Sequence, residues 1–243
     1  MIILQELCVG CGRCQPLCPA AAIRYEGLKS AVDQEACYEC STCRNSSVCP
    51  VDAIAESPNV FNSPRALRRY FSDPSSTHKA TGIQGRGTEE TKSADVTRRL
   101  PEGKVGIAIE VGRPTLGMSL LDVQKITRAI ARAGVHKIEA HNPIHSMLAN
   151  EATGDLKPEL LGERVLSAII ELEVERNEVR SLLRTLKEVA REVDSVFCID
   201  AFTVLEPGLT IPKEVLEEIR AEGFTWRPNA KINMGLGRAW ELG

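Results

Sequence analysis

The chain has 243 residues, of which 43% are hydrophobic and only 4% aromatic, with 30 basic and 33 acidic side chains. This length suits two modest domains. No run of about 18 apolar residues occurs and the first residues lack the features of a secretory signal, so we expect no membrane span and a cytoplasmic location. The formal net charge of -3 is too small to indicate nucleic-acid binding.

Two related cysteine motifs hold eight of the nine cysteines. The first motif reads C-x2-C-x2-C-x3-C-P and consists of Cys8, Cys11, Cys14 and Cys18. The second reads C-x2-C-x2-C-x5-C-P and consists of Cys37, Cys40, Cys43 and Cys49. Both copies end in Pro-x-x-Ala-Ile, so the segment is an internal repeat whose closing isoleucines, Ile23 and Ile54, supply apolar surface near the cysteines.

Disulfides and structural zinc are the alternative uses of such cysteines. Disulfides need an oxidising compartment, and no export signal is present. Zinc sites favour two C-x2-C pairs at a longer separation, whereas this segment has two triads that are each followed by a Cys-Pro pair. The spacing therefore favours iron-sulfur clusters.

Residues 1–57 resemble the dicluster bacterial-type ferredoxins, and both cysteine motifs carry the resemblance. It implies two 4Fe-4S clusters, because each motif supplies three ligands to one cube and its last cysteine to the other. Cluster 1 is then held by Cys8, Cys11, Cys14 and Cys49, and cluster 2 by Cys37, Cys40, Cys43 and Cys18. The longer x5 spacing departs from the family pattern and predicts a bulge at 45–47.

Residues 58–103 are predicted to form a basic connector, with eight basic and five acidic side chains against four and seven in 1–57. A short helix is expected, with Ser63 as its N-cap and Pro64 at its first position, running to Phe71. Either this segment wraps the acidic ferredoxin module, or the loop with Gly85, Arg86 and Gly87 docks a partner enzyme or an anionic ligand. No strand precedes these glycines, so a nucleotide fingerprint is not supported.

Residues 104–206 show the order strand, helix, strand, strand, helix, strand, which predicts a βαββαβ ferredoxin-like sandwich and gives the whole chain an α+β fold class. Ser119 and Asp122 predict a cap for the first helix, and Asn177 for the second. The expected elements are strands at 105–111, 135–140, 165–175 and 195–205, with helices at 120–133 and 178–193. The topology resembles ACT-like regulatory domains, which leaves open a scaffold or dimerisation surface or a small-molecule pocket.

The remaining candidates lie outside the cysteine motifs. His141, Asn142 and His145 stand at the start of a predicted long loop and are candidates for a ligand contact. Cys198 lies in an apolar run, which predicts a buried core thiol. Residues 207–243 are expected to form a helix at 212–221 and an irregular tail.

The leading hypothesis is a low-potential electron-transfer protein or iron-sulfur subunit, rather than a catalyst, that delivers single electrons to a partner oxidoreductase in anaerobic metabolism. All eight clustered cysteines are used as ligands, so no iron keeps an open position for a substrate. The alternatives are a component of a reductive or biosynthetic enzyme whose C-terminal domain binds a small molecule, and a ligand-gated redox regulator. The expected partner is a redox protein or a larger oxidoreductase complex, and the C-terminal domain is a candidate surface for a homo-oligomer.

Overall fold

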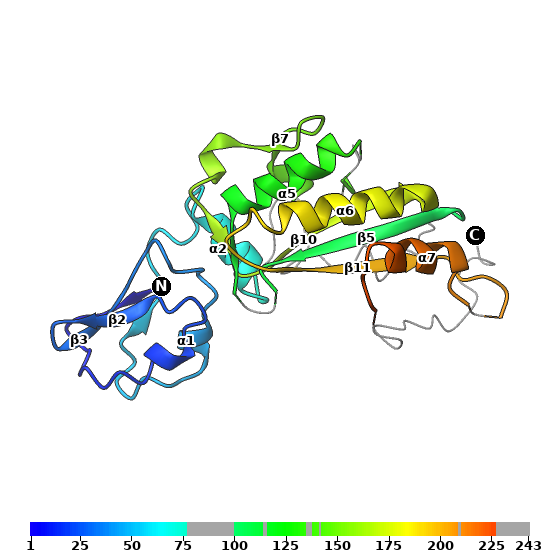
Figure 1. Cartoon of the computed structure of the whole chain (residues 1–243). Coiled ribbons are helices and arrows are strands. Elements are labelled where there is room, and N and C mark those ends of the chain that lie inside the picture. The colour runs from blue at the N-terminus through cyan, green and yellow to red at the C-terminus, as the bar shows by residue number, and fades with distance from the viewer. Residues whose placement is uncertain (77–99, 114–115, 135–137, 141, 209, 227–243) are drawn as a thin grey trace, which may run out of the picture.

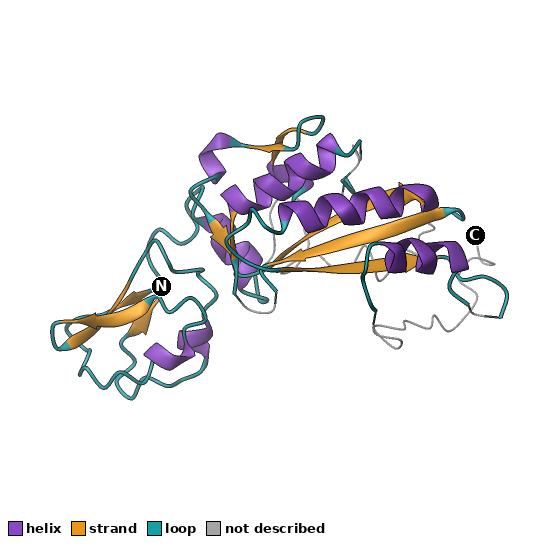
Figure 2. Cartoon of the chain, in the orientation of Figure 1, coloured by secondary structure: helices purple, strands orange, loops and turns teal. Residues whose placement is uncertain are grey.

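The computed structural model describes residues 1–76, 100–113, 116–134, 138–140, 142–208 and 210–226. The chain forms a small, loop-rich N-terminal module and a larger part in which helices cover a sheet (Figures 1 and 2). Its content of helices and strands is mixed, in agreement with the α+β class. The predicted docking loop with Gly85, Arg86 and Gly87 lies outside the described residues, as does His141. Within the described residues, no helix is long and apolar enough to cross a membrane.

The N-terminal module is closed by its own two ends. Strand β1 (Ile2–Ile3) pairs antiparallel with β4 (Ile54–Ala55), which brings the two ends of the cysteine-rich segment together. Strands β2 (Ile23–Glu26) and β3 (Lys29–Val32) form a hairpin. Its two-residue turn begins at Gly27 with φ +63°, the conformation that a tight hairpin turn requires at this position.

The second cysteine motif accommodates its two extra residues without a break. Helix α1 (Thr42–Asn45) follows the second cysteine of the run and contains the third, and Ser47 then takes a left-handed conformation with φ +52°. The segment where a bulge was expected is therefore the end of a short helix and a turn. The chain returns from this turn to Cys49 and β4.

Helix α2 (Ala66–Ser72) lies inside the predicted connector and begins later than the sequence suggested. Arg65, rather than Ser63, occupies the N-cap position, because residues 62–65 form a turn in which the Asn62 carbonyl accepts from the amide of Ala66. Leu67 and Phe71 are buried in the hydrophobic core of the larger part. Helix α2 is thus packed into the C-terminal part rather than lying free between two domains.

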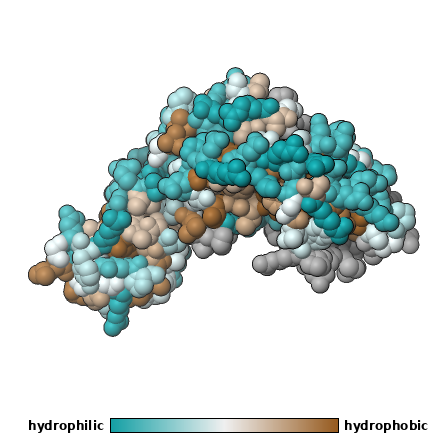
Figure 3. Space-filling view, in the orientation of Figure 1, coloured by the Kyte–Doolittle hydropathy of each residue, from teal (hydrophilic) through white to brown (hydrophobic). Residues whose placement is uncertain are grey.

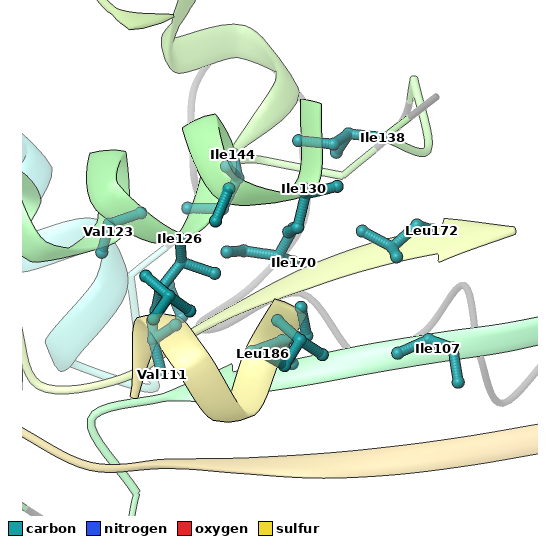
Figure 4. Close-up of a cluster of buried hydrophobic side chains, with 14 of the residues drawn as sticks. Ile107, Val111, Val123, Ile126, Ile130, Ile138, Ile144, Ile170, Leu172 and Leu186 are labelled. Carbon is teal, nitrogen blue, oxygen red and sulfur yellow. The ribbon is translucent and has the colours of Figure 1, made fainter. Parts of the chain in front are cut away.

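The larger part is built on a three-stranded antiparallel sheet. Strand β5 (Lys104–Val111) lies in the centre, between β10 (Ala168–Glu175) and β11 (Phe197–Thr203). Helices α5 (Leu120–Arg132) and α6 (Val179–Val189) lie on the same face of this sheet (Figure 1). Their apolar side chains and those of β5 and β10 form the core shown in Figure 4.

The strand predicted at 135–140 is reduced to one bridge among the described residues. Ile138 pairs with Leu172 of β10, and the Glu139 amide donates to the Glu171 carbonyl at 2.9 Å. The order across the sheet is therefore Ile138, β10, β5, β11. The following segment makes its own short elements, so regular pairing with β10 does not continue.

That segment was predicted to be a long loop. It contains a 3-10 helix (His145–Met147), the paired strands β7 (Leu148–Asn150) and β8 (Asp155–Leu156), and a second 3-10 helix (Pro158–Leu160). Strand β9 (Arg164–Val165) then pairs with β6 (Met118–Ser119) just before α5. The segment is therefore an ordered cover over one side of α5.

Helix caps show one correct and one wrong prediction. The Ser119 side chain accepts from the amide of Asp122 at 3.1 Å, as predicted for the start of α5. Asn177 does not cap the second helix. Glu175 and Glu178 form a capping box around a 3-10 turn (Arg176–Glu178) that leads into α6. The final helix, α7 (Lys213–Ala221), packs against α6.

Candidate functional site

The eight clustered cysteines line two separate cavities of the N-terminal module. Site one is a cavity that is partly open to solvent. Its cysteines are three from the first motif and one from the second: Cys8, Cys11, Cys14 and Cys49. Ile3, Val51 and Ile54 complete an apolar lining. Residues that are 35 positions apart, Cys14 and Cys49, thereby meet at one cavity.

Site two has the reciprocal composition. Its cysteines are Cys18 from the first motif and Cys37, Cys40 and Cys43 from the second. Met1, Ile23 and Val32 provide apolar walls. The two closing isoleucines are distributed in the same way, since Ile23 lines site two with Cys18 and Ile54 lines site one with Cys49.

The sequence repeat extends to the backbone. In each copy the chain adopts positive φ angles at three equivalent positions, which are Gly10, Gly12 and Ala21 in the first and Glu39, Ser41 and Asp52 in the second. The last cysteine of each copy also accepts a backbone amide four residues later. Ala22 donates to Cys18 Sγ and Ala53 to Cys49 Sγ, both at 3.2 Å. Both copies therefore present their sulfur atoms through the same local geometry.

Burial sets the electrostatics of the thiols. It raises the pKa of Cys43 to about 12 and also raises the pKa values of Cys37 and Cys14. A thiolate is the form that binds metal, so the burial of Cys14, Cys37 and Cys43 favours their neutral thiols unless a positively charged group shares the cavity. All eight cysteines are free of disulfide bonds.

Three arginines of the α2 region surround the loop that carries the site-two motif. Arg65 donates to Glu39 Oε1 from Nε at 3.0 Å and from Nη2 at 2.6 Å. Arg68 donates to the Cys37 carbonyl at 2.9 Å, and Arg69 donates to the Ser41 hydroxyl. Their spacing of three and four residues puts them on one side of a helical turn. This spacing was the available sequence signal, although it does not reveal which groups the arginines contact.

Tyr38 is the second link between site two and the larger part. Its ring lines the cavity, its hydroxyl donates to the Leu116 carbonyl at 2.7 Å, and the Arg164 guanidinium lies 6.0 Å from the ring centre. Gly117 lets the ring approach, because a Cβ at this position would lie 2.2 Å from the tyrosine hydroxyl oxygen. No motif or periodicity in the sequence indicates this contact.

Site one has the more solvent-exposed surroundings of the two cavities. Cys11 is exposed, whereas no cysteine of site two is. Nearby apolar side chains also face solvent, with Val9 63% and Leu28 90% exposed, and the Gly10 backbone packs against the Leu28 carbonyl. Figure 3 shows hydrophobic surface at this tip of the molecule. Site one is therefore the more accessible of the two cavities.

Asn142 and His145, the other predicted contact residues that the structure describes, do not line the cysteine cavities. His145 lies 3.7 Å from Glu151 in the cover segment, and Asn142 is fully buried with its Oδ1 accepting from the Ile144 amide. Cys198 is exposed, which corrects the prediction of a core thiol. Its position on β11 alternates away from the helix-covered face, and its Sγ contacts the Arg113 carbonyl at 3.7 Å.

Two cysteine-lined cavities built from a duplicated motif define the class of iron-sulfur ferredoxin domains. In agreement, the family described as "4Fe-4S binding domain" matches residues 1–24. These residues contain the whole of the first cysteine motif, and the match does not extend into the C-terminal part.

Among curated relatives, a ferredoxin-like protein in nif region of Bradyrhizobium diazoefficiens is 33% identical over 72 residues, which cover 28% of this chain and 89% of the relative. Ferredoxin Fdx2 of Sorangium cellulosum is 31% identical over 70 residues, covering 26% and 67%. The chain therefore belongs to the 4Fe-4S ferredoxins through its N-terminal quarter. A subunit of an ion-translocating oxidoreductase complex of Methanosarcina acetivorans is 43% identical over 47 residues, covering 19% of this chain and only 17% of that relative.

The residues present fit an iron-sulfur cube. Within the described residues, no three or more His, Cys, Asp or Glu side chains are arranged to hold one metal ion. A cube takes one thiolate at each of four iron corners, so its ligands stand further apart than those of a single ion. Four free thiols, an apolar lining and a backbone amide directed at one sulfur satisfy this requirement in each cavity.

Proposed function

We propose that the chain is a low-potential electron-transfer protein or iron-sulfur subunit that holds two 4Fe-4S clusters. Cluster 1 is held in site one by Cys8, Cys11, Cys14 and Cys49, and cluster 2 in site two by Cys18, Cys37, Cys40 and Cys43. The observation that carries the proposal is the reciprocal composition of the two cavities, each with three cysteines of one motif and one of the other. The clusters supply one-electron redox chemistry, and the chain supplies their ligands, charge and cover.

A relay explains the ligand sets better than a catalyst does. Each cavity offers four thiols, which is the full complement for one cube and leaves no iron corner for a substrate. Cys198 lies on β11, outside both cavities. The protein's own residues therefore bind, shield and orient the clusters rather than perform chemistry on a substrate.

The two sites differ in access, and we propose that they serve as two stations. Site one, with the exposed Cys11 and the apolar tip around Leu28, exchanges electrons with a soluble partner. Site two lies against α2 and the Leu116 loop and is the inner station. Electron transfer needs close approach of the centres, so the exposed station is the natural point of contact for a partner.

The C-terminal part is proposed to be a βαββαβ domain that provides specificity for a partner oxidoreductase. The order of strands along the chain supports this fold. β5, β10 and β11 correspond to its first, third and fourth strands, and the bridge at Ile138 marks the second. The relative named as a subunit of an ion-translocating oxidoreductase complex supports a redox partner of the larger, multi-subunit kind. Anaerobic metabolism is the proposed setting, because low-potential cubes of this kind suit it.

Metal and sulfide analysis of the anaerobically purified full chain tests the proposal. We expect about eight irons and eight acid-labile sulfides per chain, as two cubes require. Cys198→Ser is the matched control and should leave both counts unchanged, because this cysteine is not a ligand. A count near four of each would contradict the two-cluster assignment.

A further inference from the structure

Arg68 is the most deeply buried of the three arginines in the α2 region, with 2% of its surface exposed. Its Nη1 atom donates to the carbonyls of Gln34, Glu35 and Cys37 at 3.1, 2.8 and 2.9 Å. These carbonyls lead into the site-two motif. One guanidinium therefore holds the segment that delivers the first ligand of that motif.

The other side of the same guanidinium faces the C-terminal part. Arg68 Nε forms an ion pair with Glu163, and Nη2 donates to the Gly162 carbonyl at 3.4 Å. The Glu163 side chain is only 11% exposed, so the pair is screened weakly by water. The Glu163 carboxylate, which belongs to the C-terminal part, is thereby paired with the Arg68 guanidinium that holds the site-two loop.

Arg65 and Arg69 do not share this arrangement. Arg65 pairs with Glu39, and Arg69 pairs with Glu56 and with Asp73 immediately after α2. Their partners belong to the ferredoxin module or to the connector. Among the ion pairs of the described residues, Arg68–Glu163 is the one that joins this arginine group to the C-terminal part. The charge balance at site two thus depends on contact between the two parts of the chain.

Resting on the proposed function, we propose that Arg68 is a positioning residue for site two and that Arg68 and Glu163 together set the reduction potential of that site. Reduction adds one electron to a buried site and makes it more negative. A positive charge nearby stabilises the reduced form and raises the potential, whereas a negative charge lowers it. The C-terminal part therefore acts on the redox site through the Glu163 carboxylate.

The test is a redox titration of the anaerobically purified full chain, followed by spectroscopy that resolves the two sites. Arg68→Gln should shift the one-electron equilibrium of site two at least tenfold toward the oxidised form, a fall of about 59 mV. Glu163→Gln should shift the same equilibrium toward the reduced form. The double variant should return close to the wild-type value, and site one should move by less than about a third as much in every case, because it lies further from the pair.

Potential shifts of opposite sign in Arg68→Gln and Glu163→Gln distinguish an electrostatic role of the pair from a merely structural one. A loosened loop would move the potential in the same direction in both single variants, and that result would overturn the proposal. Arg128→Gln is the matched control, because Arg128 pairs with Asp155 at the surface of the larger part, and it should leave both potentials unchanged.

Two further variants keep the proposal testable if Arg68→Gln does not fold. Arg68→Lys keeps the positive charge with fewer hydrogen bonds, so the potential should stay near wild type while thermal stability falls. Glu163→Gln alone must raise the potential of site two, and an unchanged value would overturn the proposal. A wild-type count of one cube would instead refute the proposed function, so the two failures are distinguishable.

Discussion

Sites one and two arise from copies of one motif and share their backbone conformation, yet their surroundings differ. Site one has an exposed cysteine and faces solvent beside Val9 and Leu28. Site two is covered by α2 and by the loop at Leu116, through Arg68 and Tyr38. A duplicated motif therefore fixes the cavities, while the side chains added around one copy decide which cavity is enclosed.

The residue types at the left-handed positions of the two copies account for part of this difference. The first copy has Gly10 and Gly12 where the second has Glu39 and Ser41, at similar φ angles. Glycine accepts positive φ without strain, but it offers no side chain. The second copy bears a backbone cost at these positions, and both of its side chains contact arginines of the α2 region.

Removal of the last cysteine of either motif gives the largest expected effect. Cys18→Ala should remove iron from site two, which holds the cysteines of the other motif, and leave site one filled. Cys49→Ala should do the reverse. Iron and sulfide counts should fall from about eight to about four in each variant, and spectroscopy identifies the site that remains.

The contrasting result is easy to recognise. If each substitution emptied the cavity of its own motif, the reciprocal arrangement would be wrong. Cys198→Ser again serves as the control, with no loss of either site expected.

Glycine substitutions in the first copy give the next largest effect. Gly10 and Gly27 have similar φ angles, +69° and +63°, but a Cβ at Gly10 would lie 2.1 Å from the Leu28 carbonyl oxygen, whereas one at Gly27 would meet nothing within 4 Å. Gly10→Ala should therefore cost about 3 kcal/mol, from backbone strain plus overlap, and Gly27→Ala about 1–2 kcal/mol from strain alone.

Thermal unfolding of the two variants under anaerobic conditions, at one fixed scan rate, measures this difference. Equal losses in the two variants would show that the close contact between Gly10 and the hairpin is not made in solution.

Much of the fold could be predicted from the sequence because its signals are local. The alternation at Val105 to Val111 predicted β5, and the Ser119 hydroxyl caps α5 as expected. The cysteine spacing also indicated iron-sulfur chemistry, which the family match supports. These features depend on residues that are close in sequence, so periodicity and spacing reveal them.

Sequence patterns failed where tertiary contacts decide. The basic composition of 58–103 favours contact with the acidic ferredoxin module, and Arg68 does donate to carbonyls of that module, but no pattern indicates that it also pairs with Glu163 of the C-terminal part. Cys198 has apolar neighbours in sequence, but its strand position puts it on the exposed side. No pattern within 58–76 indicates that Leu67 and Phe71 enter the core of the larger part, because their partners lie far along the chain.

The smallest expected effect compares two tyrosines that each donate to a backbone carbonyl. Tyr38 is 7% exposed and reaches Leu116 across the boundary between the two parts at 2.7 Å, whereas Tyr25 is 54% exposed and reaches Gly10 at 3.1 Å. Tyr38→Phe should destabilise the chain by about 1 kcal/mol, since a shielded hydrogen bond is lost. Tyr25→Phe should destabilise it by less than about 0.5 kcal/mol, because water can donate to the Gly10 carbonyl in place of the tyrosine hydroxyl. Anaerobic thermal unfolding measures both. A larger loss for Tyr25→Phe would mean that site one, not site two, depends more on tyrosine contacts, which would reverse the comparison between the exposed and the enclosed site.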